Sequence, residues 1–289
     1  MDTTKLKKMN LVGVMGDPVD ENPSYIMFES VFAAAGLNWR YLNLLVKKNQ
    51  LKAAIEGARA MDFRGFAITM PHKIGAVELL DDIATDARLI GAVNTARREG
   101  DRFYGENTDG KGFLTSLTQT GKVEPTGKKI VCIGAGGAGR AICVELALAG
   151  AKHIIVCNRK IESDMGISLV EKINEKTSTK AEFIPWEEEI PVPNDTDVLV
   201  NATPLGFYPN IDAMPPVKET DIRKEMVVCD VVPFPADTPF LRMARKRGAI
   251  TLNGLEMLVN QGAIQFKMWT GVQADSEVMR ESLKKALGL

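Results

Sequence analysis

The residues with the clearest chemical implication form a glycine-rich segment made of Gly134, Gly136, Gly137, Ala138 and Gly139. The segment follows an apolar run, KKIVCI, and opens a run with helical periodicity, AGRAICVELALAG. Between a strand and a helix, such glycines permit a tight turn, bring backbone N–H groups close to a pyrophosphate, and let the helix pack against the strand. The spacing therefore predicts a dinucleotide site, with a ligand-free strand-to-helix turn as the alternative.

The residues at the end of the next apolar run discriminate between the two nicotinamide dinucleotides. The run HIIVCN ends at Asn158 and continues with Arg159 and Lys160, whereas an NAD-binding chain usually carries Asp or Glu there. Two cations favour the 2′-phosphate of NADP, because guanidinium and ammonium groups bind phosphate well. The alternative is a solvated basic loop, so NADP is favoured and NAD stays open.

A lysine and an aspartate in the first 110 residues are a second candidate for chemistry. Lys73 lies where a buried strand, 65–69, gives way to a helix expected from Pro71, and ligands gather at this end of strands in α/β sheets. Helix starts favour acidic residues, so Lys73 is electrostatically out of place for a purely structural role. Asp109 closes a later apolar stretch, and the two side chains together predict a proton-handling pair.

These residues need elements that bring them to strand ends, and the chain alternates between strand-like and helix-like segments. The alternation predicts an α/β fold with mainly parallel sheets and helices on both faces. Strands are expected at 10–15, 39–46, 65–69, 129–133, 153–158, 198–202, 227–232 and 249–252, and helices at 24–35, 50–60, 138–149, from Pro71 and after Gly254.

The composition excludes several classes of protein. With 36 basic and 37 acidic residues among 289, the net charge of −1 does not fit a nucleic-acid-binding protein. The chain has no apolar run of about 18 residues for a membrane span and no apolar stretch near its start that would indicate a secretory signal. We therefore expect a cytoplasmic protein. Its four cysteines are expected to be buried thiols, and with two histidines no metal site is expected.

Several motifs in the same order make the sequence resemble the shikimate dehydrogenase family, including its quinate/shikimate branch. The matching motifs are TMPHK at 69–73, GAVNT at 91–95, NTDGKGF at 107–113, GAGGAGRA at 134–141, NRK at 158–160, NATPLG at 201–206, DVVPFPADTPFL at 230–241 and GLEMLVNQGAIQFKMWTG at 254–271. The resemblance implies a substrate-binding α/β domain over 1–112, a Rossmann-type, doubly wound dinucleotide-binding domain over 113–255, and a C-terminal helical segment over 256–289 that packs on the first domain.

The resemblance also implies roles for particular residues. Lys73 and Asp109 match the catalytic pair, and Thr69, Asn94 and Gln261 match the residues that bind the ring hydroxyls. The implied reaction is reversible hydride transfer between a nicotinamide and a ring hydroxyl of shikimate, with quinate as a further substrate, in the biosynthesis of aromatic amino acids.

Further residues are implied to bind the cofactor and the substrate carboxylate. Asn201, Thr203, Val232 and Gly254 fall in segments that border the nicotinamide half of the cofactor. The family's first loop usually reads His-Ser-x-Ser-Pro, and its two serines hold the substrate carboxylate. Here Ser24 retains the second serine.

The chain departs from the family pattern at the carboxylate site and in the cofactor loop. Asn22 replaces the first serine of the carboxylate loop, Glu21 replaces the histidine, and Pro233 stands where the family usually has a tyrosine. In the cofactor loop, Ser163 replaces a second basic residue common in NADP-preferring members, and Ile161 replaces an aspartate common in the quinate/shikimate branch. Neither cofactor pattern is complete.

Three hypotheses follow from these matches and departures. The first is a shikimate or quinate/shikimate dehydrogenase that uses NADP or NAD. The second keeps the chemistry but moves it to another cyclic polyol or an amino-substituted acid, because the carboxylate site is altered at Asn22 and Pro233. The third is a catalytically idle NADP(H)-binding regulatory protein. A small molecule is the expected partner, with no nucleic acid or membrane, and the chain is expected to be a monomer or homodimer.

Overall fold

The computed structural model describes residues 8–20 and 22–289, and the chain divides into two compact units. The first unit comprises the chain up to Thr108 together with 261–289, and the second comprises 109–260. The expected divisions were after residues 112 and 255. The observed first unit keeps Thr108 and Gln261 because both are hydrogen-bonded to Asn94 in its interior.

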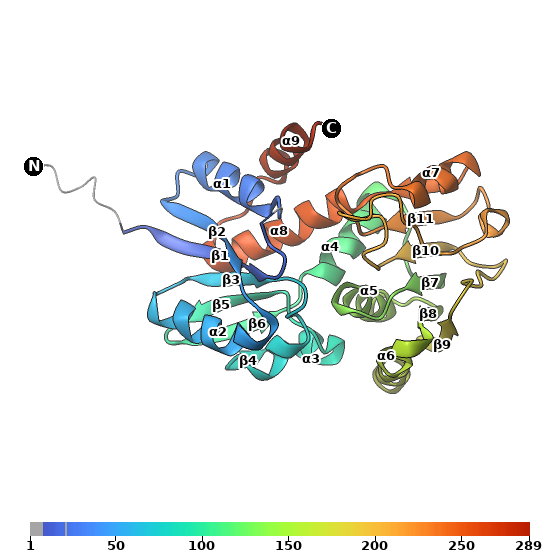
Figure 1. Ribbon diagram of the computed structural model, residues 1–289, viewed down its shortest axis with the longest axis horizontal. Helices are drawn as coiled ribbons and strands as arrows, with labels where there is room; N and C mark the ends of the chain where they lie inside the picture. Colours follow the sequence, from blue (N-terminus) through green and yellow to red (C-terminus); the bar gives the residue numbers. More distant parts are fainter. Residues whose placement is uncertain (1–7, 21) are drawn as a thin grey trace, which may run out of the picture. The chain divides into compact units, whose positions relative to one another are not determined.

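The first unit is built on a six-stranded mixed sheet (Figure 1). Its strand order is β2-β1-β3-β5-β6-β4, with β1, β2 and β3 parallel and β5 antiparallel to both neighbours. Because β4 is parallel to β6, five of the six strands run in the same direction and β5 alone is reversed, so the expectation of a mainly parallel sheet is confirmed for this unit. The elements are β1 (Asn10–Gly16), α1 (Ser24–Ala34), β2 (Trp39–Leu45), α2 (Leu51–Ala60), β3 (Gly65–Ile68), β4 (Asp82–Ile83), α3 (Thr85–Ile90), β5 (Thr95–Glu99), β6 (Arg102–Glu106), the end of α8 (Gly254–Thr270) and α9 (Ser276–Leu287).

The helix expected from Pro71 does not form as an α-helix. Residues after β3 make tight turns and then one short 3₁₀ helix, Gly75–Glu78. The backbone carbonyl of Lys73 accepts a hydrogen bond from the N–H of Val93 at 2.8 Å, so this carbonyl does not take part in a helical hydrogen bond. Lys73 therefore lies in an irregular turn, and the prediction of a helical first turn was wrong.

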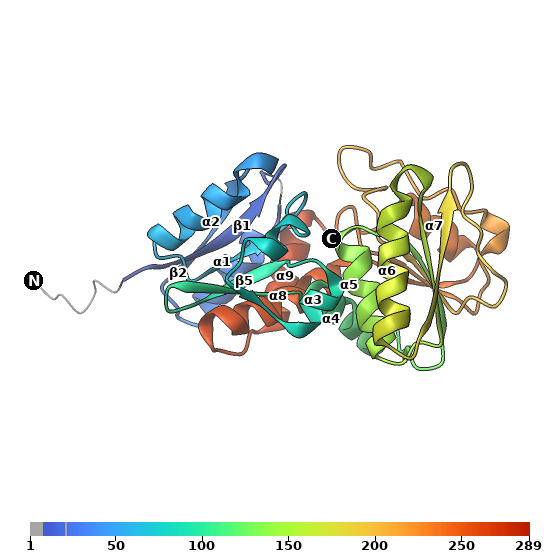
Figure 2. The same cartoon turned by 90° about the horizontal axis from the view of Figure 1, so that it is seen from below.

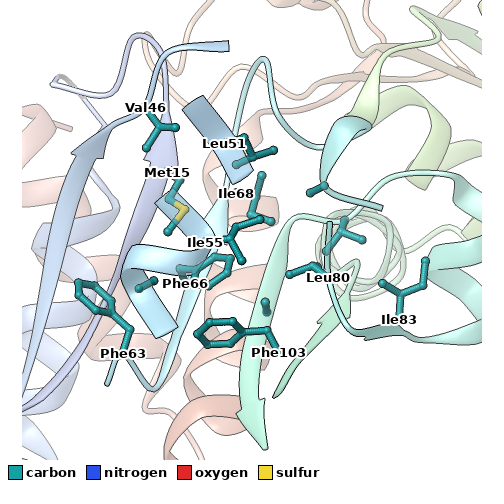
Figure 3. Packing of buried hydrophobic residues seen from close by; sticks show 14 of the residues in the cluster. Met15, Val46, Leu51, Ile55, Phe63, Phe66, Ile68, Leu80, Ile83 and Phe103 are labelled. Carbon is teal, nitrogen blue, oxygen red and sulfur yellow. The ribbon is translucent and has the colours of Figure 1, made fainter. Parts of the chain in front are cut away.

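The two faces of this sheet carry different helices (Figure 1). On the face covered by α2, Ile55 and Leu51 pack against Met15, Ile68 and neighbouring side chains (Figure 3). Because side chains alternate along a strand, the residues next to these, such as Ala67 on β3, point to the other face. That face is covered by α1, α8 and α9.

Aromatic residues hold α8 on its face of the sheet. The Trp269 ring lies 5.1 Å from the Phe28 ring, and its indole N–H donates to the Ala96 carbonyl at 3.0 Å. A Cβ on Gly65 would lie 2.5 Å from this indole, so the glycine makes room for the helix. The contact fixes the angle of α8 and, with it, the polar residues one and two turns earlier.

The second unit has a six-stranded, fully parallel sheet in the order β12-β11-β10-β7-β8-β9 (Figure 1). Read from β9, this is the 3-2-1-4-5-6 order of the Rossmann fold. Helices α5 and α6 lie on one face and α7 on the other (Figure 2). The elements are α4 (Asp109–Thr115), β7 (Lys129–Ile133), α5 (Gly137–Leu148), β8 (His153–Arg159), α6 (Ser163–Lys176), β9 (Lys180–Trp186), β10 (Val198–Asn201), β11 (Val227–Asp230), α7 (Pro239–Lys246) and β12 (Ile250–Leu252).

Four of these elements, α4, α6, β9 and α7, were not foreseen. In β9 the inward side chains are only partly buried, because it is an edge strand, and this weakens the alternation that a strand prediction needs. Among the described residues, no helix is long and apolar enough to cross a membrane, and no cluster of three acidic, histidine or cysteine side chains is placed to hold a metal ion.

Candidate active site

The glycine loop lies at the carboxyl edge of the parallel sheet, between β7 and α5. Gly134 has a φ of +107°, a conformation that other residues rarely adopt. A Cβ on Gly139 would lie 2.0 Å from the carbonyl oxygen of Gly134, so this glycine is required for the helix to approach the strand. At Gly136 a Cβ would meet nothing within 4 Å. The open space there and the close packing at Gly139 match the two uses of glycine in a dinucleotide loop.

The start of α5 has the free N–H groups that a phosphate needs. Gly136 is its N-cap and supplies no side-chain cap, and Gly137, Ala138 and Gly139 form the first turn. β7 and β10 are neighbours in the sheet although β8 and β9 separate them in sequence, which makes this the point where the strand order reverses. Ligands of doubly wound sheets bind outside the strand ends at such a point.

The expected 2′-phosphate residues follow at the end of β8. Arg159 is exposed and forms an ion pair with Glu162 at 2.7 Å, and Lys160 forms one with Glu187 at 3.2 Å. Asn158 is buried and donates to the backbone carbonyl of Glu162 at 3.1 Å. Both cations are at the position that the sequence predicted, but a phosphate there has to compete with two carboxylates.

The loop after β10 is organised by the side chain of Asn201. Its amide NH₂ donates to the Leu205 carbonyl at 3.1 Å and to Asp230 Oδ1 at 3.0 Å. Its oxygen accepts from the N–H and hydroxyl of Thr203, at 3.1 and 2.7 Å. Asn201 thus acts as a support that shapes the loop 201–206, rather than as a group turned toward a ligand.

Asp230, which the sequence analysis did not single out, anchors the neighbouring loop. Its carboxylate accepts hydrogen bonds from the Thr238 hydroxyl at 2.7 Å and from the Val232 N–H at 3.1 Å. Burial raises the pKa of Asp230 to about 6, although these hydrogen bonds act in the opposite direction. The spacing of Asp230 and Thr238, on either side of a Pro-rich turn, was the available signal.

Val232 and Gly254 are held together by their backbones. The Gly254 N–H donates to the Val232 carbonyl at 3.2 Å. A Cβ at Gly254 would lie 2.2 Å from the Val231 carbonyl oxygen, so only glycine allows α8 to begin this close to the end of β11. Both residues lie at the carboxyl edge of the same sheet as the glycine loop.

In the first unit, a network of amides and hydroxyls lies where β3 and β6 end and β5 begins. The buried Asn94 donates to Thr108 Oγ1 at 2.9 Å and to Gln261 Oε1 at 3.0 Å, and accepts from the Thr108 N–H at 2.8 Å. Gln265, one turn later on α8, donates to Gln261 at 2.8 Å and to Thr108 Oγ1 at 3.2 Å. The structure therefore brings Asn94 and Gln261 together, and it adds Thr108 and Gln265, which sequence reasoning missed.

Thr69 and Lys73 lie at the same edge of this sheet. Thr69 directly follows β3, and its N–H donates to the Met15 carbonyl at 3.0 Å. A Cβ on Gly16 would lie 2.3 Å from the Thr69 methyl, so this glycine makes room for the threonine. The N–H of Ile68 donates to the Asn94 carbonyl at 2.7 Å, which ties this strand end to the amide network. Asp109, 5% exposed, is the first residue of α4 and of the second unit.

The altered carboxylate loop forms a polar cluster with β2, which we call the β1–β2 cluster and define as Asn22, Ser24, Tyr41 and Asn43. Asn22 Oδ1 accepts from the Ser24 N–H at 2.9 Å, and the Asn22 carbonyl accepts from the Asn43 amide at 3.2 Å. The Ser24 hydroxyl is hydrogen-bonded to the Tyr41 hydroxyl, and burial strongly raises the pKa of Tyr41. Glu21 lies outside the described residues, and Pro233 follows Val232 without an N–H or a hydroxyl to offer.

Comparison with known proteins identifies the relatives of this chain. The family model for the shikimate dehydrogenase substrate binding domain matches residues 14–96, and the model for the shikimate 5′-dehydrogenase C-terminal domain matches 254–284. The chain is 41% identical to the shikimate dehydrogenase (NADP⁺) of Methanocaldococcus jannaschii over 96% of each chain.

Two solved structures show the same fold with a TM-score of 0.87. A shikimate dehydrogenase in complex with NADP⁺ is 40% identical, over 96% of both chains. The ligand-free 5-ketofructose reductase of Gluconobacter sp. strain CHM43 is 45% identical, over 96% of this chain and 99% of that one. Two relatives with similar identity to this chain are therefore named for different substrates, shikimate and 5-ketofructose.

Proposed function

Because this chain belongs to the shikimate dehydrogenase family, we propose that it is a nicotinamide-dependent dehydrogenase that interconverts a secondary hydroxyl of a small polyol and the corresponding ketone. Shikimate and 3-dehydroshikimate are the first pair to consider, with quinate as a further substrate. The supporting observation is that Asn94 and Gln261, 167 residues apart in sequence, are hydrogen-bonded at the strand edge that also carries Thr69 and Lys73.

In this proposal the chain's own residues handle the proton and hold the ring. Thr69, Asn94 and Gln261 bind ring hydroxyls, because hydroxyl and amide groups can both donate and accept. Lys73 takes the proton of the reacting hydroxyl, and Asp109 orients that hydroxyl. A bound nicotinamide would supply the acceptor for the hydride of the same carbon.

The residues of the second unit fit such a cofactor. Gly134, Gly136 and the first turn of α5 (Gly137, Ala138 and Gly139) would hold the pyrophosphate, and the loops at Thr203, Val232 and Gly254 would border the nicotinamide. Arg159 and Lys160, with Asn158 beneath them, would bind the 2′-phosphate, which favours NADP. Because Glu162 and Glu187 already pair with these cations, NAD remains the second cofactor to test.

Substitution of Lys73 tests the chemical part of this proposal. We expect Lys73→Ala to lower kcat by roughly 10²–10⁴-fold, the usual contribution of a general acid or base. The dissociation constant of NADPH, measured by its fluorescence, should not change. Lys285→Ala, at an exposed position of α9, is the matched control and should keep wild-type turnover. Full turnover by Lys73→Ala would remove the lysine from the mechanism.

A second candidate function keeps this chemistry and changes the substrate to a polyol without a carboxylate. Asn22 and Pro233 support it, because both positions have lost a hydroxyl that the family pattern uses. The 45% identity to a 5-ketofructose reductase supports it as well. Reduced nicotinamide absorbance with shikimate, quinate and fructose, each with NADP⁺ and NAD⁺, distinguishes the two candidates.

We also propose that the protein works in the cytoplasm as a monomer or homodimer. The four cysteines support the location, since each is a buried free thiol, as is typical of proteins from a reducing compartment. Sedimentation equilibrium would determine the oligomeric state.

A further inference from the structure

We infer that the β1–β2 cluster selects a neutral polyhydroxy substrate and disfavours a carboxylate, with Asn22 as the residue that determines this specificity. The inference deepens the second candidate function and rests on the dehydrogenase proposal for its chemistry. In that reaction the carbinol carbon gives up a hydride to the oxidised nicotinamide, the hydroxyl proton passes to Lys73, and a neutral ketone results.

The cluster faces the same side of the sheet as Thr69. Asn43 pairs in register with Val14, which pairs with Ala67, and Thr69 lies two residues beyond Ala67. Leu44, the neighbour of Asn43, packs on the α2 face, so Asn43 points to the opposite face. The cluster and the proposed hydroxyl-binding residues therefore belong to one face and one end of the first unit.

The hydrogen bonds within the cluster leave one buried acceptor for a ligand. A backbone carbonyl can only accept, so the Asn22 carbonyl requires the NH₂ group of Asn43 on its side. This orientation leaves Asn43 Oδ1 buried, and no partner for it exists among the described residues. A buried acceptor without a partner costs about 1–3 kcal/mol, and a hydroxyl is the donor that would relieve it. A carboxylate, which is itself an acceptor, would not.

Asn22 presents an amide where the family pattern has a serine hydroxyl, and only the NH₂ group of that amide can donate. Asn22 Oδ1 is occupied by the Ser24 N–H in a short-range turn, which fixes the side chain. The Ser24 hydroxyl is in turn bonded to that of Tyr41, whose raised pKa keeps it protonated and neutral. The four members of the cluster thus carry no charge that could balance a substrate carboxylate.

The charges of the adjoining loop act in the same direction. Among its described residues, the segment from Asp17 to Ser24 contains the acidic residues Asp17 and Asp20 and no basic residue. Lys47, which lies beside this loop, forms an ion pair with Asp17 at 3.4 Å. An anionic substrate would therefore approach a negatively charged loop, whereas a neutral polyol would meet no such repulsion.

A matched pair of ligands, shikimate and methyl shikimate, isolates the charge of the carboxylate. We expect the wild-type enzyme to use the methyl ester with a kcat/KM about tenfold above that of the acid, a modest effect for like charges near a surface. Asn22→Ser should reverse the preference by restoring a hydroxyl donor. Asn22→Asp keeps the turn but adds a charge, so it should depress use of the acid further and leave the ester unchanged.

Binding measurements separate this inference from the proposed chemistry. Calorimetric titration of the NADP⁺-bound protein with each ligand should show the same ester preference and the same reversal in Asn22→Ser. If neither ligand is turned over but these affinities behave as expected, the specificity inference stands and the dehydrogenase proposal fails. If the wild type prefers the acid, or if Asn22→Ser and Asn22→Asp leave the ratio unchanged, the inference is wrong.

Discussion

The two sheet edges at which we propose ligands to bind are built in opposite ways. In the second unit, the glycine loop requires residues without side chains, because a Cβ on Gly139 would lie 2.0 Å from the Gly134 carbonyl oxygen. In the first unit, the edge works through side chains that bind one another, with Asn94 joined to both Thr108 and Gln261.

This difference determines what each edge can recognise. Backbone N–H groups at a helix start bind a phosphate that is the same in every dinucleotide. A network of amides and hydroxyls recognises the positions of individual hydroxyls, and it changes with each substitution. We therefore expect variation in substrate to arise in the first unit, as at Asn22, while the second unit keeps its geometry.

The largest predicted effect comes from adding one methyl group to the glycine loop. Gly139→Ala places a Cβ against the Gly134 carbonyl, so β7 and α5 must separate. We expect NADPH binding, measured by fluorescence titration, to weaken on the order of a thousandfold or more, since the helix start no longer meets the pyrophosphate.

Gly136→Ala is the matched control for the fold. Its Cβ would meet no atom within 4 Å, and its backbone is extended. The free energy of unfolding of the second unit, measured by thermal denaturation, should therefore stay within about 1 kcal/mol of the wild-type value. Equal losses of stability in Gly136→Ala and Gly139→Ala would show that steric contact is not what distinguishes these glycines.

A smaller effect is expected in the first unit. Asn94→Ala leaves the buried N–H of Thr108 without its partner and removes the Asn94 bond to Gln261, at a cost of about 3–4 kcal/mol. Hydrogen exchange of the α8 segment 261–270 should accelerate, because α8 loses this attachment to the sheet. Asn49→Ala, at an exposed position, should leave the exchange unchanged. Unaltered exchange in Asn94→Ala would mean that aromatic contacts such as those of Phe266 and Trp269 hold the helix without Asn94.

The same difference explains why the sequence predicts one edge better than the other. The glycine loop could be predicted because Gly134 and Gly139 report backbone geometry through local spacing, whereas the Rossmann-type domain was implied by the family resemblance. The contact between Asn94 and Gln261 could be expected only through the family resemblance, since no local pattern joins residues so far apart. The turn at Lys73 was wrongly predicted to be a helix. The Lys73 carbonyl accepts a hydrogen bond from the Val93 N–H, and no local sequence pattern indicates this contact.

The smallest effect concerns pH, and we expect it to arise from the hydrogen-bond network of the second unit. The Asn94 network consists of neutral amides and hydroxyls, whereas the network around Asn201 contains the carboxyl group of Asp230. Burial raises the pKa of Asp230 from 3.8 to about 6. Well below pH 3.8 the group is protonated in both the folded and the unfolded chain. As the pH rises through 6, the unfolded chain ionises first, so the folded unit loses up to about 3 kcal/mol of stability.

Asp230→Asn should abolish this loss while keeping the network, since the Thr238 hydroxyl can rotate to accept from the new amide. Urea unfolding followed through Trp186, on β9 of this unit, measures the effect between pH 4 and pH 8. The wild type should lose stability relative to Asp230→Asn across this range, and carboxylates of the same unit with lowered pKa, such as Asp195, contribute equally to both proteins. Parallel pH curves for the two proteins would show that Asp230 ionises at its ordinary pKa, and that the two networks do not differ in their response to pH.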